Sequence, residues 1–151
     1  MTPPGESTPV VFAYDGSDLA KHAIEEAGRL LTNGGDAFVV TVWQPFDVGF
    51  LPAPGVEFDA AEIAAVRSAA ERTAQAGAEL AETAGFHAQS AAVEKAPTWK
   101  GIAEFAAAHD ARMIVLGSHG RSGLTGALVG SVAGAVAAHS TRSVLIVHRE
   151  S

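Results

Sequence analysis

Residues 112–131 read RMIVLGSHGRSGLTGALVGS and contain the most informative structural pattern of the chain. The segment 112–117 is apolar throughout after Arg112, which is typical of a strand buried on both faces of a parallel sheet. A loop follows with five glycines among the fourteen residues 117–130. Ser131 then stands at the start of an alanine- and valine-rich segment, where it predicts the N-cap of a helix. The stretch therefore predicts a buried strand, a glycine-rich connection and a helix.

The same alternation of elements extends in both directions along the chain. Short apolar or β-branched runs predict five strands, at residues 9–14, 37–43, 86–93, 112–117 and 143–148. Apolar residues at helical spacing predict four helices between them, at residues 20–31, 57–84, 97–109 and 131–139. This order predicts a single doubly wound α/β domain, a parallel sheet with right-handed crossovers. Ligands bind such sheets beyond the carboxyl ends of the strands, so the expected site includes Asp15, Val42 and the loop after Gly117.

Two segments stand outside the alternation. Residues 1–8 are polar and rich in proline and glycine, which predicts a flexible tail before a domain at 9–151. Residues 44–56 contain three prolines and two glycines and predict a long connection between the second strand and the long helix. A loop of that length in a small domain is often functional or mobile.

Composition limits the classes of function. The chain has 151 residues, 48% of them hydrophobic, which is enough for one packed core. A net charge of −7 without a basic run argues against nucleic-acid binding. The absence of cysteine excludes disulfides and thiolate metal sites, and the six histidines show no HxH or HExxH spacing. No apolar run reaches the length of a membrane span, and the first residues do not resemble a signal peptide. We therefore expect a cytoplasmic protein with no membrane contact.

The glycine-rich loop is typical of a phosphate-binding site. Glycine lets backbone amides approach an anion closely, and the N-terminus of the following helix favours negative charge. The loop has neither the Gly-Lys-Ser/Thr of a Walker motif nor a GxGxxG fingerprint. The alternative is a flexible surface loop followed by an ordinary serine cap. His119 and Arg121 could likewise either contact phosphate or belong simply to the loop, and Trp43 and Trp99 could border a pocket or serve only in packing.

The loop shows a further pattern: Gly117, two residues, Gly120, nine residues, then Gly130 and Ser131. This spacing resembles the nucleotide-binding signature of the universal stress protein family, in its ATP-binding branch. Residues 10–30 look like the first strand and helix of that family, and residues 112–149 look like its last third. The resemblance implies a Rossmann-like five-stranded sheet of order 3-2-1-4-5 with helices on both faces.

The resemblance also implies roles for individual residues. Asp15 would contact the adenosine part of the ligand, Ala13 would line the same pocket, and Val42 would hold the adenine edge through its main chain. The remaining implied residues are Leu116 and Gly117 beneath the ribose, and Gly120, Gly130, Ser131, Val132 and Ala133 around the phosphates. Ala133 cannot donate a side-chain hydrogen bond, where some ATP-binding members have threonine. Mg²⁺ could accompany the phosphates.

Three functions remain open from the sequence. The first is a regulatory or signalling protein that binds ATP or another adenine nucleotide in response to stress. The second is an enzyme that hydrolyses ATP slowly. Ser17 stands where a phosphatase would need a carboxylate, and Gly117 to Gly120 do not match the GxSxG of a hydrolase. The third is a dimerisation module without a ligand, against which the intact glycine spacing argues.

The last strand suggests how the protein assembles. Residues 144–147 are apolar and contain no proline, lysine or glycine. In the implied strand order this strand lies at the edge of the sheet, where unprotected strands tend to pair with other chains. The resemblance implies a homodimer formed by antiparallel pairing of these strands. The alternative is a monomer whose tail 1–8 covers the edge.

Overall fold

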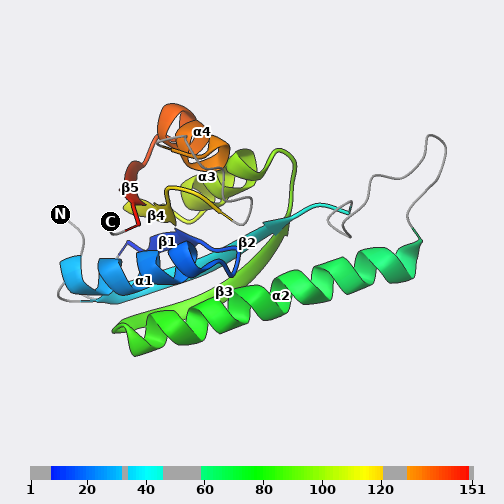
Figure 1. Cartoon of the computed structure of the whole chain (residues 1–151), viewed down its shortest axis with the longest axis horizontal. Helices are drawn as coiled ribbons and strands as arrows, with labels where there is room; N and C mark the ends of the chain where they lie inside the picture. Colours follow the sequence, from blue (N-terminus) through cyan, green and yellow to red (C-terminus); the bar gives the residue numbers. More distant parts are fainter. Residues whose placement is uncertain (1–7, 32–33, 46–58, 121–128, 150–151) are drawn as a thin grey trace.

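The computed structural model describes residues 8–31, 34–45, 59–120 and 129–149 (Figure 1). Its strands are β1 (Val10–Ala13), β2 (Gly35–Trp43), β3 (Phe86–Glu94), β4 (Met113–Gly117) and β5 (Ser143–Val147). Its helices are α1 (Asp18–Leu30), α2 (Ala60–Thr83), α3 (Thr98–Ala108) and α4 (Ser131–His139). All paired strands are parallel, in the order β3-β2-β1-β4-β5. The expected doubly wound α/β fold and its strand order are confirmed.

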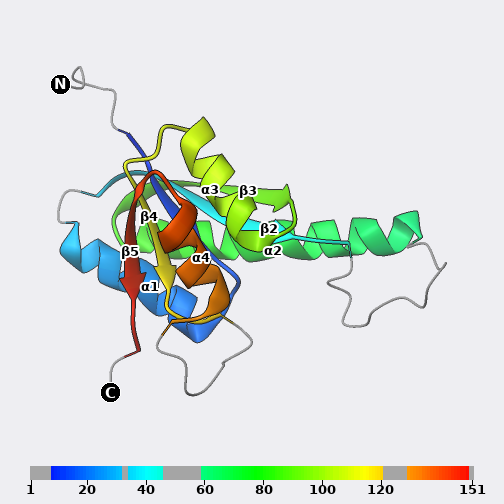
Figure 2. The same ribbon diagram turned by 90° about the horizontal axis from the view of Figure 1, so that it is seen from above.

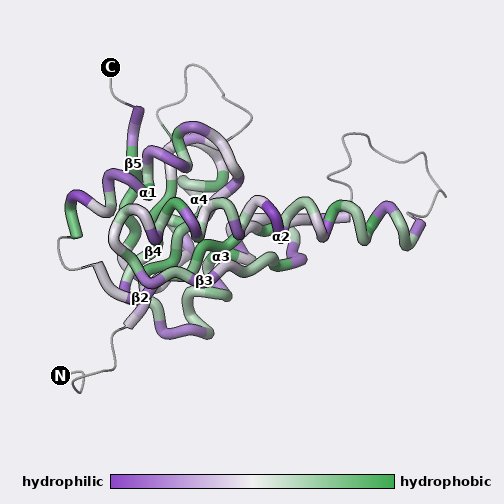
Figure 3. Tube along the Cα trace, turned by 90° about the horizontal axis from the view of Figure 1, so that it is seen from below, coloured by the Kyte–Doolittle hydropathy of each residue, from purple (hydrophilic) through white to green (hydrophobic). Residues whose placement is uncertain are grey.

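The helices cover the sheet in two layers, α1 and α2 on one face and α3 and α4 on the other (Figures 1 and 2). Each face buries its own hydrophobic cluster. Phe12 and Phe86 meet edge-to-face at 5.2 Å between ring centroids beneath α1 and α2. Val11, Ile114 and Val136 belong to the cluster beneath α3 and α4. Figure 3 shows hydrophobic segments, in green, gathered in the middle of the molecule around β4 and α3, as expected for a sheet covered on both faces.

Side chains fix where two of the helices begin. Ser17 caps α1, its hydroxyl accepting a hydrogen bond from the Ala20 amide at 3.2 Å. Asp59 caps α2, its carboxylate accepting from the Ala61 amide at 2.6 Å. The helix expected from residue 57 therefore begins at Ala60, because Asp59 satisfies an amide of its first turn.

The start of α4 corrects one prediction. Gly130, not Ser131, is the N-cap, and Ser131 is the first helical residue. The Gly130 amide donates to the Ser118 carbonyl at 2.6 Å, which holds Gly130 in an extended conformation before the helix turns. A serine before an apolar run does not reveal this one-residue shift.

Some expectations fall on residues that the structure does not describe. These are the tail up to residue 7, the connection from residue 46 to residue 58, and Arg121. Among the helices of the described residues, none combines the length and apolar character needed to cross a membrane.

Helix α2 lies unusually close to the sheet at Gly77. A Cβ atom at this position would lie 2.6 Å from Tyr14 Cδ1 and 2.6 Å from Val39 Cγ1. Real side-chain contacts do not reach such distances, so only glycine fits here without a shift of the helix or the ring. Gly77 therefore sets the distance between α2 and the β1–β2 pair, whose carboxyl ends form the site described below.

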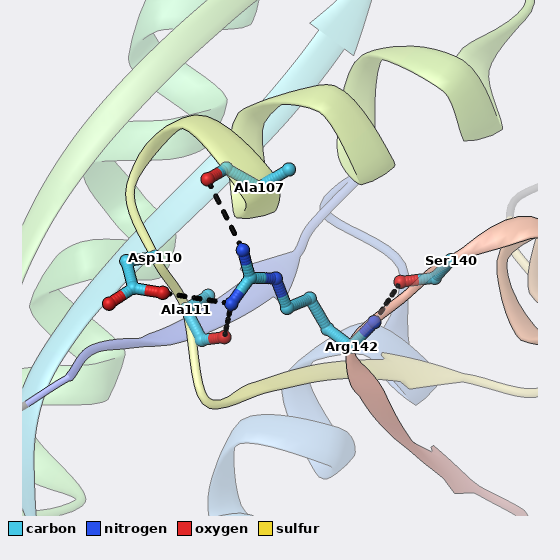
Figure 4. Close-up of polar contacts among 5 residues, drawn as sticks. All are labelled: Ala107, Asp110, Ala111, Ser140 and Arg142. Atoms are coloured by element: carbon cyan, nitrogen blue, oxygen red, sulfur yellow. Dashed lines mark hydrogen bonds and ion pairs between the residues drawn. The ribbon is translucent and has the colours of Figure 1, made fainter.

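At the amino-terminal edge of the sheet, Arg142 joins three elements (Figure 4). Its guanidinium donates to the Asp110 carboxylate at 2.9 Å and to the carbonyls of Ala111 at 3.3 Å and Ala107 at 3.4 Å. Its backbone amide donates to the Ser140 hydroxyl at 3.0 Å. A cation is favourable at a helix C-terminus, where carbonyls lack helical partners. Arg142 thus connects the end of α3 to the start of β4 and the start of β5.

Candidate functional site

A pocket of about 940 Å³ opens at the carboxyl edge of the sheet. It lies above the ends of β1, β2 and β4 and between α2, α3 and the start of α4. The structure brings together all ten residues singled out from the sequence: Ala13, Asp15, Val42, Leu116, Gly117, Gly120, Gly130, Ser131, Val132 and Ala133. Their individual roles in binding stay predictions.

The topology explains why the pocket forms at this point. After β1 the chain passes to α1 on one face of the sheet, and after β4 it passes to α4 on the other face. The two departing connections separate and leave a crevice, which is where ligands bind in open α/β sheets. The expectation that the site lies where the strand order reverses agrees with the position of this pocket.

Asp15 and Gly120 lie against each other in that crevice. A Cβ atom at Gly120 would lie 2.5 Å from Asp15 Oδ2, so the carboxylate lies directly against the glycine. Asp15 Oδ1 accepts a hydrogen bond from the Ser17 amide at 2.9 Å, which orients the side chain from the start of α1. The absence of a side chain at Gly120 is therefore a requirement of this contact.

The start of α4 forms the opposite wall. The hydrogen bond from Gly130 to Ser118 brings the end of the loop back over the end of β4. A Cβ at Gly130 would lie 3.0 Å from the Ser118 carbonyl oxygen and 3.4 Å from His119 Cα, so a branched side chain would displace the backbone. Ser131 is exposed in the first turn, where amides and the helix dipole attract anions.

The main chain of Val42 provides a polar edge for the pocket. The Tyr14 amide donates to the Val40 carbonyl at 2.9 Å, so Val40 faces β1. Alternate residues of a strand direct their amide and carbonyl to the same neighbour, so those of Val42 point to the same side. Because β1 ends at Ala13, which pairs with Val40, the amide and carbonyl of Val42 lie beyond the end of β1. They offer one donor and one acceptor side by side.

Three buried polar side chains of the described residues all line this pocket: Thr41, Gln44 and Ser118, with 8%, 9% and 2% of their surface exposed. Thr41 donates to the Tyr14 carbonyl at 2.8 Å and ties β2 to the end of β1. Gln44 ties the end of β2 to the turn before α3 through Lys95. The Ser118 hydroxyl lies 3.1 Å from His119 Nδ1. Hydrogen bonds within the fold therefore hold the rim of the pocket in place.

The sequence left two roles open for each of His119, Trp43 and Trp99. His119 lines the pocket, and its Nε2 is buried without a hydrogen-bond partner in the described structure. Trp43 also lines the pocket and is 3% exposed. Trp99 lies outside the described lining and stacks on His139 with ring centroids 4.6 Å apart, which agrees with a packing role.

The electrostatics of the described lining are simple. Asp15 is its single carboxylate, and it contains no lysine or arginine. Burial raises the pKa of Tyr14, and the nearby Asp15 carboxylate raises it further. The described residues contain no group of three or more histidine, aspartate or glutamate side chains placed to hold a metal ion. Within this part of the chain, an anionic ligand would therefore depend on backbone amides, the α4 N-terminus, hydroxyl groups and the His119 ring.

Sequence reasoning missed Tyr14, Thr41, Gln44 and Thr98, which also line the pocket. A polar residue at the end of an apolar strand is the signal that could have indicated Thr41 and Gln44. No local pattern indicates Thr98, because its partner Gln44 lies 54 residues away.

The fold and the pocket define the class: a doubly wound α/β domain with its site at the switch point of a five-stranded parallel sheet. The sequence pattern of the universal stress protein family matches residues 6–148. This chain therefore belongs to the universal stress protein family.

Individual relatives agree with this assignment. A universal stress protein of Mycobacterium tuberculosis is 34% identical over 155 aligned positions, covering 100% of this chain and 48% of the relative. The chain thus spans about half the length of the curated relatives it matches.

Solved structures also match. A universal stress protein in complex with cAMP is 27% identical with a TM-score of 0.67, covering 95% of this chain and 98% of that one. A universal stress protein from Archaeoglobus fulgidus in complex with dAMP is 22% identical with a TM-score of 0.61, covering 93% of this chain and 97% of that one. The second likeness concerns the fold alone.

Proposed function

We propose that this chain binds an adenine nucleotide in the pocket at the carboxyl edge of the sheet and acts as a regulatory stress-response protein. The observation that carries the proposal is the juxtaposition of Asp15, Gly120 and Gly130 around one crevice. The universal stress protein solved in complex with cAMP supports an adenine nucleotide as the ligand class. The spacing of Gly117, Gly120, Gly130 and Ser131 extends the proposal to ATP.

The geometry suggests how such a ligand would lie. The amide and carbonyl of Val42 match the ring nitrogen N1 and the amino group of adenine, which together present one acceptor and one donor. The phosphates would then reach the start of α4, where Ser131 and the free amides can bind them. Mg²⁺ bound to a triphosphate would be carried by the phosphate oxygens and would reduce their repulsion from Asp15.

Calorimetric titration tests this proposal. Protein freed of any co-purified nucleotide is titrated with AMP, cAMP and ATP with Mg²⁺, and with GMP as the control. We expect the adenine nucleotides to bind about tenfold or more tightly than GMP, because guanine presents a donor at N1 and an acceptor at C6, the reverse of what Val42 offers. Absence of binding by all adenine nucleotides would overturn the proposal, and equal binding of GMP would overturn the role of Val42.

We also propose that the protein acts as a homodimer through β5. Val144, Leu145 and Ile146 are only half-buried within one chain, although they form an apolar strand at the sheet edge. Pairing across a two-fold axis would cover the same residues in both subunits.

Light scattering coupled to size exclusion tests the dimer, with an expected mass of twice that of the chain. Leu145→Lys should shift the mass towards the monomer, because pairing of the β5 strands would bring a charged side chain to the interface in both subunits. Val147 is left unchanged because it is 6% exposed and belongs to the core cluster, whereas Leu145 is only half-buried where it packs against that cluster. A monomeric wild-type protein at micromolar concentration would contradict the proposal.

A further inference from the structure

Gln44 and Thr98 form a polar pair at one end of the pocket. Gln44 follows directly after β2, and its Nε2 donates to the Lys95 carbonyl at 2.7 Å and to Thr98 Oγ1 at 3.0 Å. The Lys95 carbonyl can only accept, so the group that faces it must be the amide nitrogen. An amide nitrogen donates hydrogen bonds and does not accept them. The Thr98 hydroxyl therefore accepts from Gln44.

This arrangement leaves the hydrogen of the Thr98 hydroxyl for another partner. A hydroxyl that accepts one bond can still donate one. The described part of the chain provides no acceptor for it, and the N-cap of α3 is Pro97, with no side-chain capping bond. The buried Gln44 amide thus orients a hydroxyl that has no capping role, at the lining of the pocket.

Thr98 lies at the same end of the pocket as Val42. A Cβ at Gly101 would lie 3.0 Å from Val42 Cγ1, so the first turns of α3 pack against Val42. Thr98 and Gly101 are three residues apart in α3 and share one face of the helix. The Thr98 hydroxyl therefore lies beside the strand end where the base would be held, and α4, where the phosphates would be bound, forms another wall.

We propose that Thr98 is a specificity-determining residue whose hydroxyl donates a hydrogen bond to a ring nitrogen of the purine base. This inference rests on the proposed nucleotide function. If Val42 engages N1 and the amino group of adenine, the acceptors that remain on the ring are N3 and N7. A bond to either one fixes which face and edge of the purine enter the pocket, and a base without that acceptor loses it.

The test compares AMP with 3-deaza-AMP and 7-deaza-AMP, each of which replaces one ring nitrogen by a carbon that cannot accept. Dissociation constants are measured by calorimetry for the wild type, Thr98→Val and Thr98→Ser. We expect one of the two analogues to bind the wild type about three- to tenfold more weakly than AMP. Thr98→Val should abolish that difference, and Thr98→Ser should retain it because serine keeps the hydroxyl.

A structural role for Thr98 would give a different result. If Thr98 only ties the turn to Gln44, Thr98→Val lowers the affinity for AMP and both analogues by the same factor, which would overturn the proposal. The same holds if neither analogue is discriminated by the wild type. Thr83→Val is the matched control, because the Thr83 hydroxyl already donates to the Glu79 carbonyl within α2, at 3.2 Å. Failure of the wild type to bind AMP at all would instead refute the proposed function.

Discussion

Gly130→Val combined with Ser131→Ala is expected to weaken nucleotide binding by about a hundredfold or more, with the fold retained. A valine at Gly130 would begin 3.0 Å from the Ser118 carbonyl oxygen and push the loop away from β4. Alanine at position 131 removes a hydroxyl from the first turn of α4. Each lost hydrogen bond to a charged phosphate costs about 1.5–3 kcal/mol, so the loss of two or more accounts for the expected factor. Calorimetric titration with the nucleotide that binds the wild type measures the change.

The control for this variant is Gly134→Ala in the same helix. Among the residues that the structure describes, a Cβ at Gly134 would meet only Val129 Cγ1, at 3.9 Å, so alanine fits beside them without displacement. The control should bind nucleotide as the wild type does, and circular dichroism should show the same helix content in all three proteins. Unchanged affinity in the double variant would mean that the start of α4 does not bind the phosphates.

Gly77→Ala is expected to lower the free energy of unfolding by about 1–3 kcal/mol. Alanine normally stabilises a helix relative to glycine by about 1 kcal/mol. The sign of the change in the free energy of unfolding therefore distinguishes overpacking from a gain in helix propensity. At Gly77 the added methyl group would lie 2.6 Å from the Tyr14 ring and from Val39, and α2 would have to move away from the sheet. Overpacking of this kind outweighs the gain in helix propensity. Chemical denaturation followed by circular dichroism measures the difference.

Gly134→Ala is again the control, and here the expected change in the free energy of unfolding has the opposite sign. Its open surroundings allow the usual helix-propensity gain, so it should raise the free energy of unfolding by about 0.5–1 kcal/mol. If both variants proved stabilising, the result would contradict the close packing of α2 against β1 and β2 at Gly77.

Local sequence patterns predicted the elements because the physics that forms them is local. The structure has strands, β1 and β4, at two of the fully apolar runs. It has helices, α1 and α2, where apolar residues recur at helical spacing. The order of the strands came from the resemblance, since hydrophobic periodicity contains no information about which strands are neighbours. The boundary at Ser131 was wrong by one residue, because the hydrogen bond from Gly130 to Ser118 decides it.

The same distinction between local patterns and long-range contacts applies to the candidate site. Asp15, Gly120 and Gly130 could be identified because glycine spacing and a strand-end carboxylate are visible in the sequence. Gln44 and Thr98 could not, because their meaning depends on each other and on Lys95, which lies 51 residues from Gln44. Only the folded sheet brings the end of β2 to the first turn of α3. Polar pairs formed over such separations are the part of a site that a single sequence does not reveal.

The position of Arg142 affects how this protein can evolve. Its bonds fasten α3, β4 and β5 at the amino-terminal edge of the sheet, whereas the pocket occupies the carboxyl edge. None of the residues it contacts lines the pocket. Mutations that change which ligand binds need not weaken the hydrogen bonds of Arg142. Mutations that strengthen or weaken those bonds need not affect ligand binding. The two edges can therefore diverge separately, so that one scaffold is able to acquire new ligands while keeping the anchorage of its helices.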